Sequence, residues 1–279
     1  MSVVIEHADA VARAAEAVAS ADALLVGAGA GMGVDSGLPD FRGDQGFWKA
    51  YPPMAKLGIR FVEMANPRWF TGDPALAWGF YGHRLNLYRA TKPHAGFALL
   101  LRWGEAMPGG VFAFTSNVDG QFQSAGYGGD VVECHGSLHH LQCSRGCGNA
   151  IWSARDVEVE VNEETFRAAE PFPVCPHCGA VARPNVLMFG DWGWIGDRTD
   201  RQETRYGSWL ETLRDRNVAV IECGAGTSVP TVRRQCEQVA AALGGTLIRI
   251  NPREPKGPAG CISIPGGALE SLHAIHDRL

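Results

Sequence analysis

Short apolar runs, each ending at polar or glycine residues, recur along the chain. The first is Ala-Leu-Leu-Val at residues 23–26, which stops at Gly27. Short runs bounded by turn residues are typical of strands buried in a parallel sheet. Four later runs share the pattern and lie at residues 111–114, 131–134, 218–222 and 246–250. The pattern therefore predicts five buried strands.

Apolar residues spaced three and four apart predict helices around these strands. One such stripe predicts a helix over residues 8–19. Another covers residues 232–243, with Pro230 near its first turn and Gly244 past its end, and a last stripe at 269–279 predicts a closing helix. Strands that alternate with helices indicate an α/β fold, here a Rossmann-like parallel sheet with helices on both faces.

Two segments interrupt this alternation. Residues 44–92 are rich in aromatics and prolines and contain a helical pattern at 75–88, whereas residues 142–181 contain four cysteines and an alternating strand pattern at 157–161. We expect the two insertions to build a small helical and zinc-binding domain. The division predicted is a Rossmann-like domain at 1–43, 93–141 and 182–279, and a small domain at 44–92 and 142–181.

Composition excludes several classes of protein. The chain has 279 residues, of which 46% are hydrophobic and 20% charged, as in an ordinary globular protein. Its net charge of −5 gives no general affinity for nucleic acid or anionic membranes. It contains no apolar run of the ~18 residues that a membrane span needs. The first residues do not form a secretory signal, so we expect a cytoplasmic protein. The oligomeric state is left open.

The eight cysteines favour a metal site over a disulfide scaffold. Four form two close pairs, Cys143/Cys147 and Cys175/Cys178, separated by 27 residues. Thiolates at this spacing suit tetrahedral zinc, and four sulfur ligands leave no position open for water. The spacing predicts a structural zinc site, with four unrelated core or redox cysteines as the alternative.

A glycine-rich turn at residues 27–43 follows the first predicted strand. Glycines let backbone N–H groups approach a diphosphate, which favours a nucleotide site, although the strict Gly-x-Gly-x-x-Gly pattern is absent. Pro39 prevents the long helix that a dehydrogenase places here. The alternative is a turn with only a structural role. A second glycine-rich segment, 224–228, precedes the helix after Pro230 and offers another phosphate site.

Polar residues follow two further predicted strands, at 115–120 and at 133–136. Ligands of open parallel sheets bind beyond the carboxyl ends of the strands. His135 therefore lies where a catalytic base would be useful, although a histidine that only forms hydrogen bonds is the alternative.

Five motifs between Ala23 and Asn251 stand in the order found in one known family. They are the segment 29–42, Thr115-Ser116-Asn117-Val118-Asp119, His135-Gly136, the segment 183–191, and Gly226-Thr227-Ser228 followed by Asn251. Over most of its length the chain thus resembles the sirtuins, the family of NAD-dependent protein deacylases.

The resemblance implies that NAD and an acyl-lysine meet between a Rossmann-like domain and a zinc domain. Nicotinamide leaves, and the acyl group of an acylated protein lysine ends on ADP-ribose. His135 would act as general base, with Asn117 as the second catalytic residue. The implied cofactor-binding residues are Gly29, Ala30, Gly31, Asp40, Phe41, Arg42, Ser116, Asn117, Asp119, Gly226, Thr227, Ser228 and Asn251.

The resemblance also implies a substrate site. Tyr81 and Arg84 lie three residues apart, on one face of the predicted helix. The pair resembles the one with which some sirtuins recognise succinyl or malonyl groups, in which arginine binds the distal carboxylate. Two amphipathic residues of a surface helix are the alternative. Phe189 and Gly190 would bind the substrate strand.

Several positions depart from the family pattern. Ser116 replaces a glutamine, Phe122 a histidine and Gly33 a serine. The segment Asp191-Trp192-Gly193-Trp194 replaces the usual approach to the peptide-binding strand, and the proline that usually follows is missing. These changes leave three hypotheses. The first is an NAD-dependent lysine deacylase, the second a sirtuin-like ADP-ribosyltransferase or NAD hydrolase, and the third a zinc and NAD-binding module without turnover.

Overall fold

The computed structural model describes residues 2–40 and 43–279. Its main feature is a six-stranded sheet in which every neighbouring pair of strands is parallel. The strand order is β11-β10-β9-β1-β2-β3. The strands span Ala23–Ala28 (β1), Val111–Thr115 (β2), Val131–Glu133 (β3), Val218–Cys223 (β9), Thr246–Ile250 (β10) and Ile262–Ile264 (β11). The five predicted strands are confirmed, and β11 is an addition.

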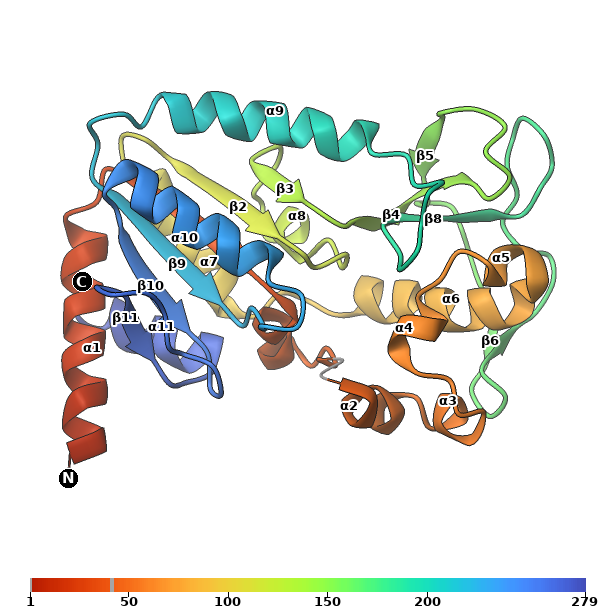
Figure 1. Cartoon of the computed structure of the whole chain (residues 1–279), viewed down its shortest axis with the longest axis horizontal. Coiled ribbons are helices and arrows are strands. Elements are labelled where there is room, and N and C mark those ends of the chain that lie inside the picture. Colours follow the sequence, from red (N-terminus) through yellow and green to blue (C-terminus); the bar gives the residue numbers. More distant parts are fainter. Residues whose placement is uncertain (1, 41–42) are drawn as a thin grey trace.

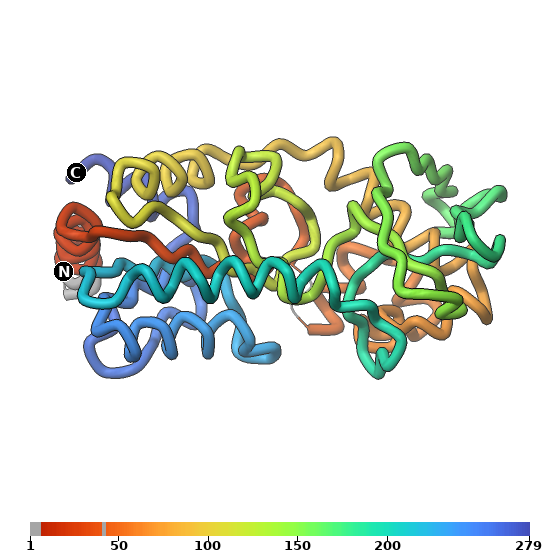
Figure 2. Tube along the Cα trace, turned by 90° about the horizontal axis from the view of Figure 1, so that it is seen from above, coloured from red at the N-terminus to blue at the C-terminus, as the bar shows by residue number. Residues whose placement is uncertain are grey.

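Helices cover both faces of this sheet (Figure 1). One layer contains α1 (Ser2–Ala19), α7 (Ala95–Glu105) and α11 (Ala268–His276), and the other α9 (Asp197–Glu211) and α10 (Thr231–Leu243). Side chains alternate along β1, so that Leu24 packs in the cluster with the first layer and Leu25 in the cluster with the second. Figure 2 shows α7 and α10 on opposite sides of the sheet. The predicted Rossmann-like fold is confirmed.

The order of the strands creates a crevice at one edge of the sheet. From β1 the chain proceeds outward to β2 and β3, whereas from β9 it proceeds in the opposite direction to β10 and β11. Strands β1 and β9 are neighbours, so the loops that follow them separate in opposite directions. Ligands of open α/β sheets bind at such a switch point, beyond the carboxyl ends of the strands.

A second group of elements lies at the other end of the molecule (Figure 1). Its helices are α2 (Gly43–Ala50), α3 (Pro52–Lys56), α4 (Phe61–Met64), α5 (Trp69–Gly72) and α6 (Pro74–Ala90). Its strands form a sheet of β5 (Ile151–Ser153), β4 (Gly136–Cys143) and β8 (Ala182–Val186), and a pair of β6 (Val161–Asn162) and β7 (Arg167–Ala168). Residues of both insertions share one buried cluster, which includes Phe47, Trp78, Phe80 and Phe166.

Two local expectations need correction, and one helix was not predicted. The strand predicted at 157–161 is wrong, because only Val161 belongs to a strand. The Val159 carbonyl instead accepts a hydrogen bond from Asn86 Nδ2 at 2.9 Å, so a side chain of α6 replaces a partner strand. The first helix begins at Ser2 rather than at residue 8, and α9 was not predicted.

Among the described residues, no helix combines the length and the apolarity that a membrane span requires.

Candidate active site

Four cysteine sulfurs converge beside the three-stranded sheet. The Sγ atoms of Cys143, Cys147, Cys175 and Cys178 all lie within 4.8 Å of one another. Two of the sulfur pairs are 3.6 and 3.5 Å apart, close to the edge of about 3.8 Å in a tetrahedron of 2.3 Å zinc–sulfur bonds. Gly146 and Gly179 have φ values of 64° and 70°, as the tight turns of the two cysteine loops require. The four residues therefore fit a zinc ion.

The two glycine-rich turns meet at the switch point between β1 and β9. Gly29 N donates to the Cys223 carbonyl and Gly31 N to the Gly224 carbonyl, both at 3.0 Å. A Cβ on Gly29 would lie 2.6 Å from Ala225 Cα, so a side chain would force the two loops apart. Glycine is thus required for the loops to touch, and their contact brings the backbone of both to one crevice.

A short 3-10 helix, η1 (Ala30–Ser36), follows the first turn. It ends at Gly37, whose φ is 89°, two residues before Pro39. The expectation that Pro39 prevents a long helix is confirmed. The chain leaves the sheet here and reaches Asp40, while the predicted residues Phe41 and Arg42 lie outside the described residues.

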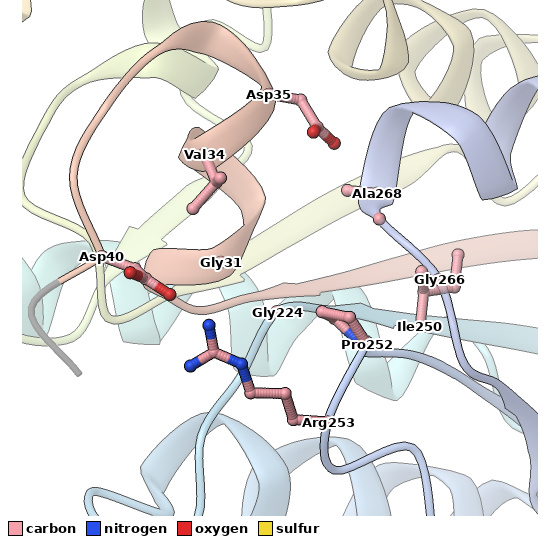
Figure 3. Close-up of a pocket in the computed structure, with 11 residues that line it drawn as sticks. Gly31, Val34, Asp35, Asp40, Gly224, Ile250, Pro252, Arg253, Gly266 and Ala268 are labelled. Atoms are coloured by element: carbon pink, nitrogen blue, oxygen red, sulfur yellow. The ribbon is translucent and has the colours of Figure 1, made fainter. Parts of the chain in front are cut away.

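A cavity opens beside these loops (Figure 3). Of the predicted cofactor-binding residues, Gly31 and Asp40 line it. Its wall continues through segments that follow β9, β10 and β11. The lining residues are Gly31, Val34, Asp35, Asp40, Gly224, Ile250, Pro252, Arg253, Gly266, Gly267 and Ala268. Glycine-rich backbone at a switch point fits a dinucleotide.

Asn251 organises the loops after β9 and β10. Its side chain is fully buried; Nδ2 donates to the Ala225 carbonyl, and Oδ1 accepts from the backbone N–H groups of Arg253 and Glu254, each at 3.0 Å. Glu254 in turn accepts a hydrogen bond from Thr227 Oγ1 at 2.5 Å. Gly226, Thr227 and Ser228 are thereby held in front of α10, and Asn251 shapes the crevice through the backbone.

Residues after β2 connect with the first glycine-rich turn. Asn117 Nδ2 donates to the Gly29 carbonyl at 3.0 Å, and Ser116 N donates to the Ala28 carbonyl at 3.1 Å. These bonds place the predicted residues Ser116 and Asn117 directly beside Gly29. The residues that follow β2 and those that follow β1 therefore form one continuous surface.

Asp119 is a buried carboxylate close to this surface. Its Oδ1 accepts a hydrogen bond from Gln121 N at 2.9 Å, and the ring of His139 contacts its backbone carbonyl at 2.8 Å. Burial raises the pKa of the Asp119 carboxyl to about 6, against the opposing effect of the Gln121 N–H and the more distant Arg84. The carboxyl is thus held in a poorly solvated position, where it interacts strongly with any polar group that reaches it.

His135 follows β3 and precedes β4. Its carbonyl accepts a hydrogen bond from Leu187 N at 3.0 Å. Gly136 is required next to it, because φ is 77° and a Cβ would lie 2.1 Å from the Asn185 carbonyl oxygen. Burial lowers the pKa of the His135 imidazole, and a hydrogen bond with the Ser116 backbone opposes the shift. The imidazole is therefore neutral at pH 7 and able to accept a proton.

The predicted substrate residues lie in two places. Tyr81 and Arg84 face the buried side of α6, with exposed fractions of 1% and 7%. Arg84 Nε and Nη2 donate to Tyr88 Oη at 2.9 and 2.7 Å. Phe189 follows β8, and its backbone N–H donates to the Ala65 carbonyl at 2.9 Å, while Gly190 has a φ of 66°. The surface alternative for Tyr81 and Arg84 is wrong, because both are buried.

Sequence reasoning missed residues that support the site. Gln121 and His139 hold the turn around Asp119, and Tyr88 holds Arg84. Tyr88 was detectable, because it lies four residues after Arg84 and hence on the same face of the helix. Gln121 and His139 leave no such signal, since their contacts depend on how separate segments fold together.

Comparison with known proteins identifies the family. The model of the Sir2 family matches residues 29–199, and the chain belongs to this family, the sirtuins. NAD-dependent protein deacylase 1 of Archaeoglobus fulgidus is 32% identical, over 92% of this chain and 93% of that protein. NAD-dependent protein deacylase 2 of Pyrobaculum aerophilum is 31% identical, over 95% and 94%. The crystal structure of a Sir2 homolog–NAD complex is 26% identical, with a TM-score of 0.69 and coverage of 95% and 93%.

Proposed function

We propose that this chain is an NAD-dependent protein lysine deacylase, which releases nicotinamide and transfers the acyl group to ADP-ribose. Its family membership and its similarity to NAD-dependent deacylases support this function. The observation that carries the proposal is the neutral, partly buried His135, which is linked through Ser116 to the glycine-rich crevice.

The residues proposed to take part in the reaction follow the carboxyl ends of β2 and β3. NAD, when bound, supplies the ribose carbon that accepts the acyl oxygen as nicotinamide departs. His135 accepts a proton from a ribose hydroxyl on its unprotonated ring nitrogen. Asn117 and Asp119 orient the carboxamide of nicotinamide, and the buried position of Asp119 makes that interaction strong.

The remaining cofactor roles follow from loop positions. Gly29, Ala30 and Gly31 offer backbone to the dinucleotide, as do the turn residues Gly226, Thr227 and Ser228, and Asn251 sets the arrangement of that second turn. Phe41 would shield the reactive ribose from water and Arg42 would orient the segment after Asp40. These last two roles stay predictions of the resemblance.

The acyl group is proposed to lie against α6. Arg84 is buried, and its guanidinium is 5.2 Å from the ring centroid of Phe80 and 5.4 Å from that of Tyr88. A guanidinium forms charge-assisted hydrogen bonds with a carboxylate, and the two hydrogen bonds from Nε and Nη2 to Tyr88 hold the Arg84 guanidinium in a defined orientation. We therefore propose that acidic acyl groups, such as succinyl or malonyl, are accepted beside acetyl. The substrate strand would pair with Phe189 and Gly190.

One observation favours a second function. The Trp192 side chain is 100% exposed, although Asp191, the preceding residue, forms a buried ion pair with Arg183. An exposed tryptophan beside the proposed substrate strand alters the surface that an acyl-peptide would meet. An ADP-ribosyltransferase or NAD hydrolase is thus the second candidate, whereas a module without turnover has no observation in its favour.

The test is an assay of acetyl-, succinyl- and malonyl-lysine peptides with NAD, with products identified by mass. We expect nicotinamide and O-acyl-ADP-ribose, and no product with His135→Ala. Consumption of NAD without an acyl substrate, or transfer of label from NAD to protein, would instead support the second candidate. The domain division at 44–92 and 142–181 and the cytoplasmic location stay predictions from the sequence.

A further inference from the structure

The cavity in Figure 3 contains one cationic side chain among its described lining residues. The charged residues in its wall are Asp35, Asp40 and Arg253. Asp35 Oδ2 accepts a hydrogen bond from Leu269 N at 2.8 Å. The guanidinium of Arg253 forms no hydrogen bond or ion pair with residues 2–40 or 43–279. Within the part of the chain that the structure describes, this exposed cation has no partner, and it lies at the wall of a cavity where an anionic ligand can reach it.

The backbone that carries Arg253 is held firmly. Its N–H donates to Asn251 Oδ1 at 3.0 Å, and the carboxylate of the next residue, Glu254, accepts from Thr227 Oγ1. Arg233 donates to the Glu254 carbonyl. These hydrogen bonds tie the loop after β10 to the segment after β9 and to α10, and Figure 3 shows the Arg253 side chain extending from this loop toward Gly31 and Asp40.

The surroundings determine which anion fits. Gly31 and Gly224 bring the backbone of both glycine-rich turns to the same wall, and the lack of side chains on them lets a ligand approach this wall closely. The Arg253 guanidinium lies opposite this backbone and suits a phosphate group, because its N–H groups form charge-assisted hydrogen bonds with phosphate oxygens.

We propose that Arg253 binds a phosphate group of the dinucleotide, and specifically the diphosphate that joins its two ribose rings. The proposal rests on the NAD binding of the proposed function. The loop after the second strand of a mononucleotide-binding unit also faces the adenosine ribose, where arginine can accept the 2′-phosphate of NADP. The shared chemistry is a phosphate group, and the two sources are separable by the choice of ligand.

The test measures binding by calorimetry for NAD, ADP-ribose, NADP and adenosine. The variants are Arg253→Ala and Arg253→Lys, with Arg201→Ala, an exposed arginine of α9 beside β3, as the control for the loss of charge. We expect Arg253→Ala to weaken NAD and ADP-ribose roughly tenfold and to leave adenosine unchanged. Arg253→Lys should retain part of the affinity. The affinity that each variant loses relative to the wild type should be smaller at high salt.

Each result has a defined meaning. Loss confined to NADP would assign the phosphate contact to the 2′ position. Unchanged affinities for all three phosphate-bearing ligands, or an equal loss for adenosine, would overturn the proposal. Failure of the wild-type protein to bind NAD and ADP-ribose would refute the proposed function together with it. In turnover, Arg253→Ala should raise KM for NAD with little change in kcat, as expected for a contact made equally in the ground and transition states.

Discussion

Replacing Asp119 by asparagine should make the protein more stable at neutral pH while abolishing its reaction with NAD. The side chain is 9% exposed, and burial raises the pKa of its carboxyl from 3.8 to about 6. The hydrogen bond from Gln121 N to Oδ1 can be accepted by asparagine as well as by aspartate. The substitution therefore removes a buried charge and keeps the local turn.

The magnitude follows from the shift in pKa. Between the two pKa values the folded protein binds more protons at Asp119 than the unfolded chain, so this group lowers stability as the pH rises through that window. A shift from 3.8 to about 6, at about 1.4 kcal/mol per unit, amounts to about 3 kcal/mol at pH 7 and above. The difference falls to about 1.5 kcal/mol at pH 5 and nears zero below about pH 4.

Urea unfolding at pH 5 and pH 8, followed by circular dichroism, measures the difference. Asp119→Asn should exceed the wild type in unfolding free energy, and the gain should be larger at pH 8. The exposed Asp130, in the turn before β3, provides the control variant Asp130→Asn. A variant at position 119 that is no more stable at pH 8, or a gain that does not depend on pH, would refute the burial argument. Nicotinamide release should be lost, because the neutral amide lacks the negative charge that strengthens the hydrogen bond with the carboxamide of nicotinamide.

Three other outcomes test the site. His135→Ala should lower the formation of O-acyl-ADP-ribose at least about a hundredfold. In the wild type, kcat/KM should decline on the acid side with a pKa below about 6.5, since burial lowers the pKa of the imidazole. A decline centred above that pH would contradict the assignment. Arg84→Met should raise KM for a succinyl-lysine peptide about tenfold or more and spare the acetyl peptide, whereas equal losses would exclude the acyl role. Chelation of the metal at the four cysteines should unfold the region around them and change the tryptophan fluorescence, to which Trp152 contributes because it packs beside them. Full activity of metal-free protein would oppose this.

The Rossmann-like sheet was predictable because its central strands are mostly apolar. Every residue of β1, β2 and β9 is buried, and such runs are visible in the sequence. By contrast, β11 is the segment Ile-Ser-Ile, in which a serine interrupts the apolar run. Helix α9 was missed because it is mostly polar, with Thr199, Gln202 and Tyr206 as its buried residues.

The metal site and the catalytic histidine were predictable for different reasons. Cysteine spacing reports directly on the geometry of zinc loops, and the four sulfurs do converge. His135 was notable only as a polar residue at a strand end. Its neutral state depends on burial by segments distant in sequence, such as the strand that leads to Leu187. No local pattern encodes that burial.

An ion pair inside the sheet explains why two charged residues interrupt apolar strands at the cofactor end. Glu222 and Arg249 are paired residues of β9 and β10, with exposed fractions of 0% and 1%. Arg249 Nε and Nη2 donate to the carboxylate at 2.7 and 2.8 Å, and Nη1 donates to the Lys256 carbonyl at 2.8 Å. A buried pair adds little net stability, although loss of one partner costs about 3–5 kcal/mol. An apolar pair would fill the same space but could not bind the Lys256 carbonyl. We therefore explain the two charged residues by the loop that Arg249 anchors, which is the loop that carries Arg253.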